Sequence, residues 1–173
     1  MRVVAGEFRG RKLAAPATAS TRPTTDRVRE AIFNALRSLD VVEGALVADL
    51  FAGSGALGIE ALSRGAERCT FVESDRHALS AIHENIASLG LTGRSRVMSG
   101  DVLVMVPRID CDIAFADPPY EFTAWPQLLD RLQAGLLVAE AAVAVESTSA
   151  WEQRRVKRYG RTWVTFLERS GGS

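Results

Sequence analysis

A loop with three glycines follows an apolar segment and opens a helix-like segment, and this feature most restricts the possible folds. Residues 45–51 are apolar except for Asp49, which is typical of a strand buried on both faces. Gly53, Gly55 and Gly58 follow with the spacing G-x-G-x-x-G, at the start of a helix predicted to reach about residue 64. A strand, a glycine turn and a helix in this order indicate a parallel α/β unit. The spacing alone also fits an ordinary tight turn.

Strand-like and helix-like segments alternate along the rest of the chain. Further strands are predicted at residues 68–73, 94–99, 112–116 and 141–146, and helices at 75–89 and 125–133. Two last segments, 154–159 and 162–168, indicate a hairpin that turns at 160–161. The pattern predicts one α/β domain of the Rossmann-like kind, a mostly parallel sheet with helices on both faces and an antiparallel hairpin at one side.

The first 25 residues differ from this α/β pattern. They are rich in Arg and Thr and predict a short strand or hairpin followed by an extended segment. We expect residues 1–25 to be a basic extension within the same domain, and residues 26–173 to form the α/β domain itself. Asp75 is predicted to cap the helix at 75–89, and Thr25 or Asp26 is predicted to cap a further helix directly after the extension. The apolar face predicted for this helix consists of Val28, Ile32, Phe33, Ala35, Leu36 and Leu39.

A net charge of zero conceals basic ends and an acidic middle. Residues 1–40 carry 8 basic and 4 acidic side chains, residues 41–150 carry 7 and 15, and residues 151–173 carry 6 and 2. Basic ends favour contact with a polyanion such as nucleic acid, although an uneven solvated surface would give the same pattern. No apolar run reaches the ~18 residues of a membrane span, and we expect no signal peptide. Cys69 and Cys111 are predicted to be buried free thiols in a reducing cytoplasm.

Two acidic residues at strand ends indicate a nucleoside-containing cofactor. Glu73 ends the second strand, 20 residues after Gly53, where a carboxylate can accept hydrogen bonds from both ribose hydroxyls. These features do not choose between NAD and S-adenosylmethionine. Asp101 follows the third strand and is a candidate acceptor for the adenine amino group, with the Val102 backbone at the ring edge. The alternative for Asp101 is a helix cap.

The sequence Asp117-Pro118-Pro119-Tyr120 after the fourth strand is the most specific motif. A residue before proline favours extended backbone, so the Asp117 carboxylate and the Pro118 carbonyl become two fixed acceptors above the sheet. Two acceptors can hold the hydrogens of an exocyclic amino group and stabilise the charge that develops when it attacks a methyl group. Tyr120 can stack on the base. The alternative is a proline-rich strand exit with a core tyrosine.

These motifs together resemble those of class I S-adenosylmethionine-dependent methyltransferases that act on amino nitrogens. The general pattern often has a further glycine where this chain has Phe51. Residues 1–13 (MRVVAGEFRGRKL), residues 22–30 (RPTTDRVRE) and Phe51 itself resemble a narrower group, the bacterial 16S rRNA guanine-N2 methyltransferases of the RsmD type. This resemblance extends from Met1 to about Tyr120.

The resemblance implies a seven-stranded sheet of order 3-2-1-4-5-7-6 with the last strand antiparallel. It implies direct methyl transfer from S-adenosylmethionine, without a metal or a covalent enzyme intermediate, by a cytoplasmic protein that we expect to be a monomer. The implied target is the N2 atom of guanine 966 of 16S rRNA, in the small ribosomal subunit or a late assembly intermediate.

The resemblance also implies roles for individual residues. The cofactor is assigned to Asp49, Gly53, Gly55, Glu73, Asp101 and Val102. The target guanine is assigned to Asp117, Pro118 and Tyr120. Contact with rRNA is assigned to Arg9, Arg11, Lys12, Arg22, Thr24 and Thr25. Further phosphate contacts are expected from Arg2, Arg154, Arg155, Lys157 and Arg158.

Several alternatives stay open. A DNA adenine-N6 methyltransferase uses the same Asp-Pro-Pro-Tyr motif, but about 40 residues before the α/β core leave little room for a target-recognition region. A glutamine-N5 methyltransferase generally has Asn in place of Asp117, and a cytosine-C5 methyltransferase needs a cysteine in this loop. An NAD oxidoreductase would leave the motif unused. A non-catalytic rRNA-binding assembly factor would bind RNA without methyl transfer.

Overall fold

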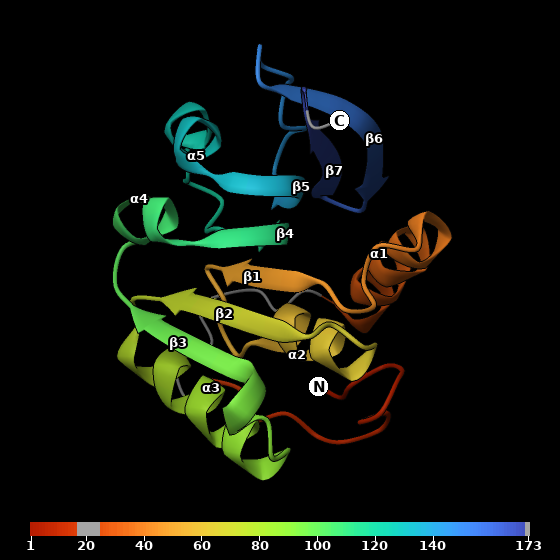
Figure 1. The fold of residues 1–173 in the computed structure, drawn as a ribbon, viewed down its shortest axis with the longest axis vertical. Helices are drawn as coiled ribbons and strands as arrows, with labels where there is room; N and C mark the ends of the chain where they lie inside the picture. Colours follow the sequence, from red (N-terminus) through yellow and green to blue (C-terminus); the bar gives the residue numbers. More distant parts are fainter. Residues whose placement is uncertain (17–24, 172–173) are drawn as a thin grey trace.

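The computed structural model describes residues 1–16 and 25–171, and within them seven strands form one sheet (Figure 1). The strands are β1 Leu46–Leu50, β2 Arg68–Glu73, β3 Ser95–Ser99, β4 Asp110–Ala116, β5 Gln133–Ala141, β6 Trp151–Tyr159 and β7 Thr162–Arg169. Their order is β3-β2-β1-β4-β5-β7-β6. Strands β1 to β5 pair in parallel, and β7 runs antiparallel to both β5 and β6. The predicted sheet order and the antiparallel last strand are confirmed.

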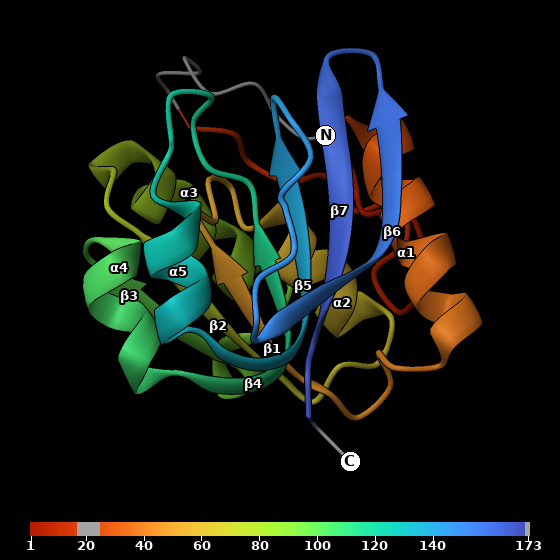
Figure 2. The same cartoon turned by 90° about the horizontal axis from the view of Figure 1, so that it is seen from above.

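Helices cover both faces of this sheet (Figure 2). They are α1 Asp26–Leu39, α2 Ala56–Ser63, α3 Arg76–Ser88, α4 Val102–Met105 and α5 Trp125–Arg131, with short 3-10 turns η1 Thr92–Arg94 and η2 Val106–Arg108. One core cluster contains the apolar side chains of α1, α2 and α3, and the other contains those of α4 and α5. The predicted caps are confirmed, because Thr25 accepts a hydrogen bond from the Val28 N–H and Asp75 accepts one from the Ala78 N–H.

The prediction of a fifth strand at residues 141–146 is wrong, and so is the end of the preceding helix. Helix α5 ends at Arg131 because Leu132 has an extended backbone with φ −73° and ψ 128°. The chain therefore enters the sheet at once, as β5 Gln133–Ala141, which pairs with β4 and β7. Val143, in the segment predicted to be the strand, is 68% exposed. Periodicity alone cannot decide which of two successive apolar segments forms the strand.

The apolar face of α1 is confirmed except at its last residue. Val28, Ile32, Phe33, Ala35 and Leu36 are buried. Leu39 is 56% exposed. The helix stops there because Asp40 adopts the left-handed conformation, with φ 54°.

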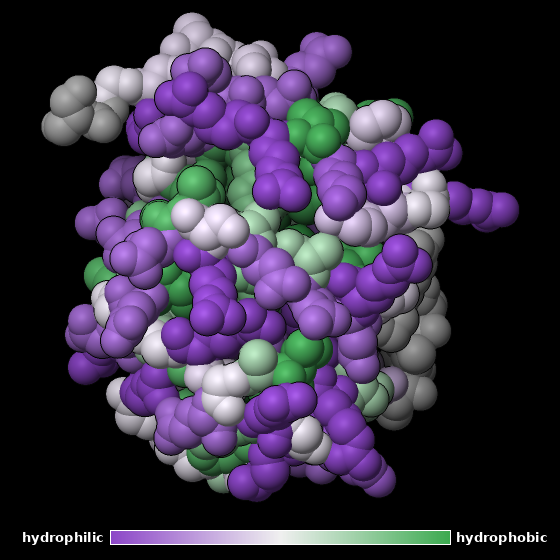
Figure 3. Space-filling view, turned by 90° about the vertical axis from the view of Figure 1, so that its right-hand side faces the viewer, coloured by the Kyte–Doolittle hydropathy of each residue, from purple (hydrophilic) through white to green (hydrophobic). Residues whose placement is uncertain are grey.

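A groove of about 1320 Å³ lies between α1 and the amino ends of β1, β4 and β5. The space-filling view of the side that carries α1 shows apolar side chains in a hollow among hydrophilic ones (Figure 3). Arg154, Arg155, Glu168 and Arg169 also line this groove. The groove therefore places these residues of the hairpin at the amino edge of the parallel strands.

Candidate active site at the carboxyl edge of the sheet

The predicted motifs meet at the carboxyl edge of the parallel strands. In the sheet Leu50 lies beside both Val72 and Ala116, and Glu73 lies beside Ser99. The glycine loop, Glu73, Asp101 and Asp117 all follow directly from these positions. Loops at the carboxyl ends of parallel strands form the ligand-binding crevice of open α/β sheets. The topology therefore brings the motifs to the place where such a fold binds its ligands.

The three glycines of the loop lie in different surroundings, and each lacks a side chain for a different structural reason. Gly53 has φ +58°, and a Cβ there would meet nothing within 4 Å, so the loop is open at this point. Gly55 has φ +80°, and a Cβ would lie 3.2 Å from the ring of Phe71. The space that Gly55 leaves is thus on the core side. A Cβ at Gly58 would lie 2.5 Å from both Cys69 and Phe71, so the missing side chain permits close packing of α2 on β2.

The Glu73 carboxylate is fixed by backbone donors at this edge. One oxygen accepts the Gly53 N–H at 2.8 Å, and the other accepts the N–H groups of Ser74 and Asp75 at 2.8 and 2.9 Å. A carboxylate has about four acceptor positions, so this arrangement has room for one ribose hydroxyl. Binding both hydroxyls, as the sequence predicts, would require one backbone donor to give way.

Asp49 lies beneath the glycine loop. It is 2% exposed, and its Oδ2 accepts the Gly58 N–H at 2.8 Å. Burial raises the pKa of the Asp49 carboxyl well above its usual value, the Gly58 N–H opposes this, and the charges of Asp117 and Glu73 raise that pKa further. Asp49 therefore connects β1 to the first turn of α2, and three carboxyl groups converge at this edge.

Asp101 is a helix cap, which is the alternative role that its sequence position indicates. Its side chain accepts the Leu103 N–H at 2.8 Å and caps the short helix α4. Val102, the first residue of that helix, is buried. The Asp101 side chain is exposed, so it retains acceptor positions toward solvent.

The Asp117–Tyr120 segment leaves β4 in a tight turn closed by a hydrogen bond from the Phe122 N–H to the Pro119 carbonyl. Asp117 is half-buried, Pro118 is buried and Tyr120 is 51% exposed. Tyr120 is therefore accessible to a base, and the alternative of a core tyrosine does not fit this exposure.

Phe51 connects the glycine loop to this turn, a link that sequence reasoning missed. Its φ of +60° is unfavourable for a residue with a side chain, which explains why glycine is common at this position. The Phe51 ring packs on the Phe122 ring with 5.1 Å between ring centres, and the Phe122 ring packs on that of Trp125 with 5.2 Å between centres. These edge contacts hold the two ligand-facing loops together.

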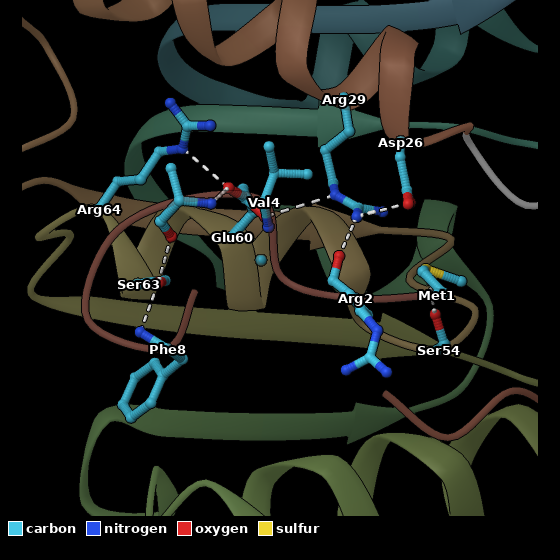
Figure 4. Close-up of polar contacts among 12 residues, drawn as sticks. Met1, Arg2, Val4, Phe8, Asp26, Arg29, Ser54, Glu60, Ser63 and Arg64 are labelled. Atoms are coloured by element: carbon cyan, nitrogen blue, oxygen red, sulfur yellow. Dashed lines mark hydrogen bonds and ion pairs between the residues drawn. The ribbon is translucent and has the colours of Figure 1, made fainter. Parts of the chain in front are cut away.

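The N-terminal segment is attached to the site by buried polar side chains. Asn85, 1% exposed, donates to the carbonyls of Ala14 and Ser54 at 3.0 and 2.9 Å and accepts the Ala14 N–H at 2.6 Å. Glu60 accepts the N–H groups of Val4 and Ala5 (Figure 4). The predicted N-terminal hairpin is present as a single antiparallel bridge between Arg2 and Lys12.

The basic residues of this segment have different surroundings. Arg9 and Lys12 are exposed, whereas Arg11 donates to the Ser88 carbonyl at the end of α3 at 2.9 Å. Thr25 is the cap of α1, and Arg22 and Thr24 lie outside the described residues. This environment gives Arg11 a structural contact in addition to any contact with a ligand.

Neither a reactive cysteine nor a cluster of metal ligands is found in the part of the chain that the structure describes. Both cysteines are buried free thiols, as predicted. Burial raises the pKa of Cys69 well above its usual value and that of Cys111 to about 12, so both stay protonated and unreactive near neutral pH. Residues 1–16 and 25–171 contain no cluster of three His, Cys, Asp or Glu side chains arranged for a metal ion. They also contain no helix with the length and hydropathy of a membrane span.

Known proteins resemble this chain over nearly its whole length. A family model described as "Conserved hypothetical protein 95" matches residues 1–168. The chain belongs to this family, the RsmD family. Ribosomal RNA small subunit methyltransferase D from Escherichia coli K12 is 40% identical over 150 residues, covering 85% of this chain and 74% of that protein. The protein of that name from Haemophilus influenzae is 34% identical over 178 residues, covering 99% and 89%.

A solved structure shows the same relationship in three dimensions. The Escherichia coli protein yhhF matches with a TM-score of 0.85 and 34% identity, over 98% of this chain and 97% of that one. The RsmD family model includes the C-terminal hairpin, beyond the region from Met1 to about Tyr120 where the sequence motifs are distinctive. The resemblance seen in those motifs is confirmed.

Proposed function

We propose that this RsmD-family protein transfers a methyl group from S-adenosylmethionine to the N2 atom of one guanine of 16S rRNA, guanine 966. Membership in the family and the names of its relatives, small-subunit rRNA methyltransferases, support the reaction and the RNA. The exposed Tyr120 next to Asp117 and Pro118 supports an exocyclic amino group as the target. We infer a monomer that acts in the cytoplasm on the small subunit or a late assembly intermediate.

The convergence of Asp49, Glu73 and Asp117 is the observation that carries the choice of cofactor. Burial is the main cause of the raised pKa of Asp49, and the negative charges of Asp117 and Glu73 raise it further; these two carboxylates make the edge more favourable for a cation than for an anion. NAD carries a negatively charged pyrophosphate, whereas S-adenosylmethionine carries a positive sulfonium. When bound, S-adenosylmethionine supplies an electrophilic methyl group. The carboxylates therefore favour it over NAD.

The residues of this edge fit the parts of that cofactor. Glu73 would hold the ribose, and Asp101 with the Val102 backbone would hold the adenine. Gly53, whose outer side is open, and the backbone of Gly55 would lie against the methionine part. Asp49 would support the loop from below through Gly58.

The target amino group would be held by Asp117 and Pro118. The Asp117 carboxylate and the Pro118 carbonyl accept its two hydrogens, which favours the geometry in which the nitrogen lone pair is available. The same acceptors stabilise the positive charge that develops on this nitrogen during transfer. Tyr120 stacks on the guanine after the base leaves its surroundings. Contact with rRNA would come from Arg9, Arg11, Lys12, Arg22, Thr24 and Thr25.

Transfer of labelled methyl groups to three substrates tests this proposal. The substrates are small ribosomal subunits from a strain lacking this methylation, protein-free 16S rRNA, and duplex DNA. We expect label on the subunits, recovered as N2-methylguanosine at guanine 966. Label on DNA as N6-methyladenine would replace this proposal by the DNA enzyme, and RNA binding without transfer would replace it by the assembly factor.

A further inference from the structure

The tip of the β6–β7 hairpin lies at the same edge of the sheet as the candidate active site. Strand β7 pairs with β5 so that Trp163 lies beside Ala141, at the carboxyl end of β5. Strand β5 in turn pairs with β4, which leads into Asp117. The hairpin tip and the loop that follows β4 both project at one end of the molecule (Figure 2).

Trp163 also shares a face of the sheet with the loop after Tyr120. Its cross-strand neighbour Ala141 packs against the core cluster of α5, and so do Phe122 and Trp125. Val143, 68% exposed, follows the end of β5. The order of the strands therefore places exposed apolar surface between Tyr120 and Trp163.

The chemistry of the tip combines cations with aromatic rings. Residues 154–163 contain five basic side chains and no acidic one. The Arg158 guanidinium lies 5.6 Å from the centre of the Trp163 ring, and the Lys157 ammonium lies 5.3 Å from that of Tyr159. Both rings are half-buried and both cations are exposed. Aromatic rings and guanidinium planes on which bases stack, with cations for phosphates, are typical of single-stranded RNA binding.

The other end of the hairpin has a different environment. Arg154 is paired with Glu168 at 2.6 Å and with Glu152 at 3.2 Å, and it lines the groove at the amino edge. Within residues 1–16 and 25–171, no ion pair links Lys157 or Arg158 to a carboxylate. Lys157 and Arg158 thus stay available to a polyanion, whereas Arg154 is a poor candidate for the phosphate contact that its sequence position suggests.

We propose that residues 157–163 bind the single-stranded rRNA that flanks the target guanine. Trp163 and Arg158 stack a neighbouring base, and Arg161 binds a phosphate beside it. The proposal rests on the proposed function, since it takes rRNA as the substrate. It adds a second rRNA attachment site to the one proposed for the N-terminal segment. In the order of the strands, Tyr120 lies between the two sites.

Single-residue variants and a matched control test this surface. Arg158→Ala, Arg161→Ala and Trp163→Leu each remove one proposed contact, Trp163→Phe keeps a stacking ring, and Arg154→Ala removes the same charge from the same strand outside the tip. Losing one stacked base weakens binding by roughly 5- to 150-fold. We therefore expect the KM for unmodified small subunits to rise about tenfold in Trp163→Leu and Arg158→Ala, with kcat and calorimetric binding of S-adenosylmethionine unchanged. Trp163→Phe and Arg154→Ala should keep the original KM.

Fluorescence anisotropy with a labelled single-stranded 16S rRNA fragment around guanine 966 gives a readout independent of catalysis. Arg161→Ala should lower the slope of log affinity against log salt by about 0.7, the value for one lost phosphate contact on a single strand. An equal KM and equal salt slope in tip variants and in Arg154→Ala would overturn the proposal. If the original protein transfers no methyl group, the proposed function fails, and the anisotropy series still decides the role of the tip. Arg158→Ala and Arg161→Ala change exposed side chains, so they keep the test decisive if Trp163→Leu does not fold.

Discussion

The carboxylate of Glu60 lies 3.4 Å from the guanidinium of Arg29, and neither side chain reaches solvent. The same carboxylate accepts the N–H groups of Val4 and Ala5 at 2.9 and 3.0 Å and pairs with Arg64 at 2.9 Å. Arg29 also donates to the Arg2 carbonyl. One buried ion pair therefore joins α1, α2 and the N-terminal segment (Figure 4).

We expect Glu60→Ala to lower the free energy of unfolding by about 3–5 kcal/mol, because it removes the buried carboxylate beside Arg29 and leaves only the largely exposed Asp26 to pair with this buried guanidinium. The matched control is Glu7→Ala, which removes an exposed carboxylate 3.3 Å from Arg94 and should cost about 0–1 kcal/mol. Urea denaturation of both variants measures the difference. Similar losses in the two variants would show that burial does not make the Glu60–Arg29 ion pair more stabilising than an exposed ion pair.

The close packing of Gly58 against β2 leads to a second prediction. A Cβ would lie 2.5 Å from the Cys69 sulfur and the Phe71 ring, so Gly58→Ala should destabilise the fold by about 1–3 kcal/mol through overpacking. Gly93→Ala is the control, because a Cβ at that position meets nothing within 4 Å, and we expect a change within about 0.5 kcal/mol. Thermal unfolding of the pair checks this. Equal stability of the two variants would mean that α2 can shift away from β2 without cost.

The strand and helix pattern could be predicted where an element has local signals at its ends. Asp75 caps α3 and Thr25 caps α1 as predicted, because a cap depends on residues only three positions apart. Strand β5 had no such signal, since residues 133–146 offer two apolar segments and only pairing with β4 and β7 selects the first. The order of the strands came from the family resemblance and not from the pattern.

The site shows the same division between local and long-range information. The motifs themselves predict that Gly53, Glu73 and Asp117 meet, because each follows a parallel strand. The contacts that fix them join distant residues. Asn85 binds Ala14 across 71 positions and Ser54 across 31, and no sequence pattern marks such pairs. The folded structure is needed to recognise Asn85 and Glu60 as supports of the site.

Glu73→Gln should weaken the binding of S-adenosylmethionine. The neutral amide is a poorer acceptor for a ribose hydroxyl, and hydrogen bonds to charged groups contribute about 1.5–3 kcal/mol, which corresponds to a loss of roughly 10- to 150-fold in affinity. Glu84→Gln, at an exposed position of α3, is the control and should bind normally. Isothermal titration calorimetry measures both. Normal affinity of Glu73→Gln would remove this residue from the proposed cofactor site.

The buried thiols predict a loss of stability at alkaline pH. Burial, assisted by the charges of Asp110 and Asp112, raises the pKa of Cys111 from 9.0 to about 12. Above pH 9 the unfolded chain loses this proton while the folded protein keeps it, so stability falls as pH rises, by up to about 1.4 kcal/mol per pH unit for each such thiol. Cys111→Ala should show a shallower decline between pH 9 and 10.5 in urea denaturation. Parallel curves for the two proteins would contradict the assigned cause.

Asp117→Ala should separate catalysis from cofactor binding. The variant loses one of the two acceptors proposed for the amino group, and removing one preorganised hydrogen-bonding partner at a reacting centre lowers kcat by about 10²- to 10³-fold. Binding of S-adenosylmethionine should persist in weakened form, because one negative charge of this edge is lost while Glu73 and the glycine loop remain. The control is Asp110→Ala, which removes an exposed carboxylate at the opposite end of β4 and should leave transfer to small subunits unchanged. Full turnover of Asp117→Ala in labelled methyl transfer would exclude the proposed mechanism, whereas loss of turnover together with loss of cofactor binding would reassign Asp117 to the cofactor.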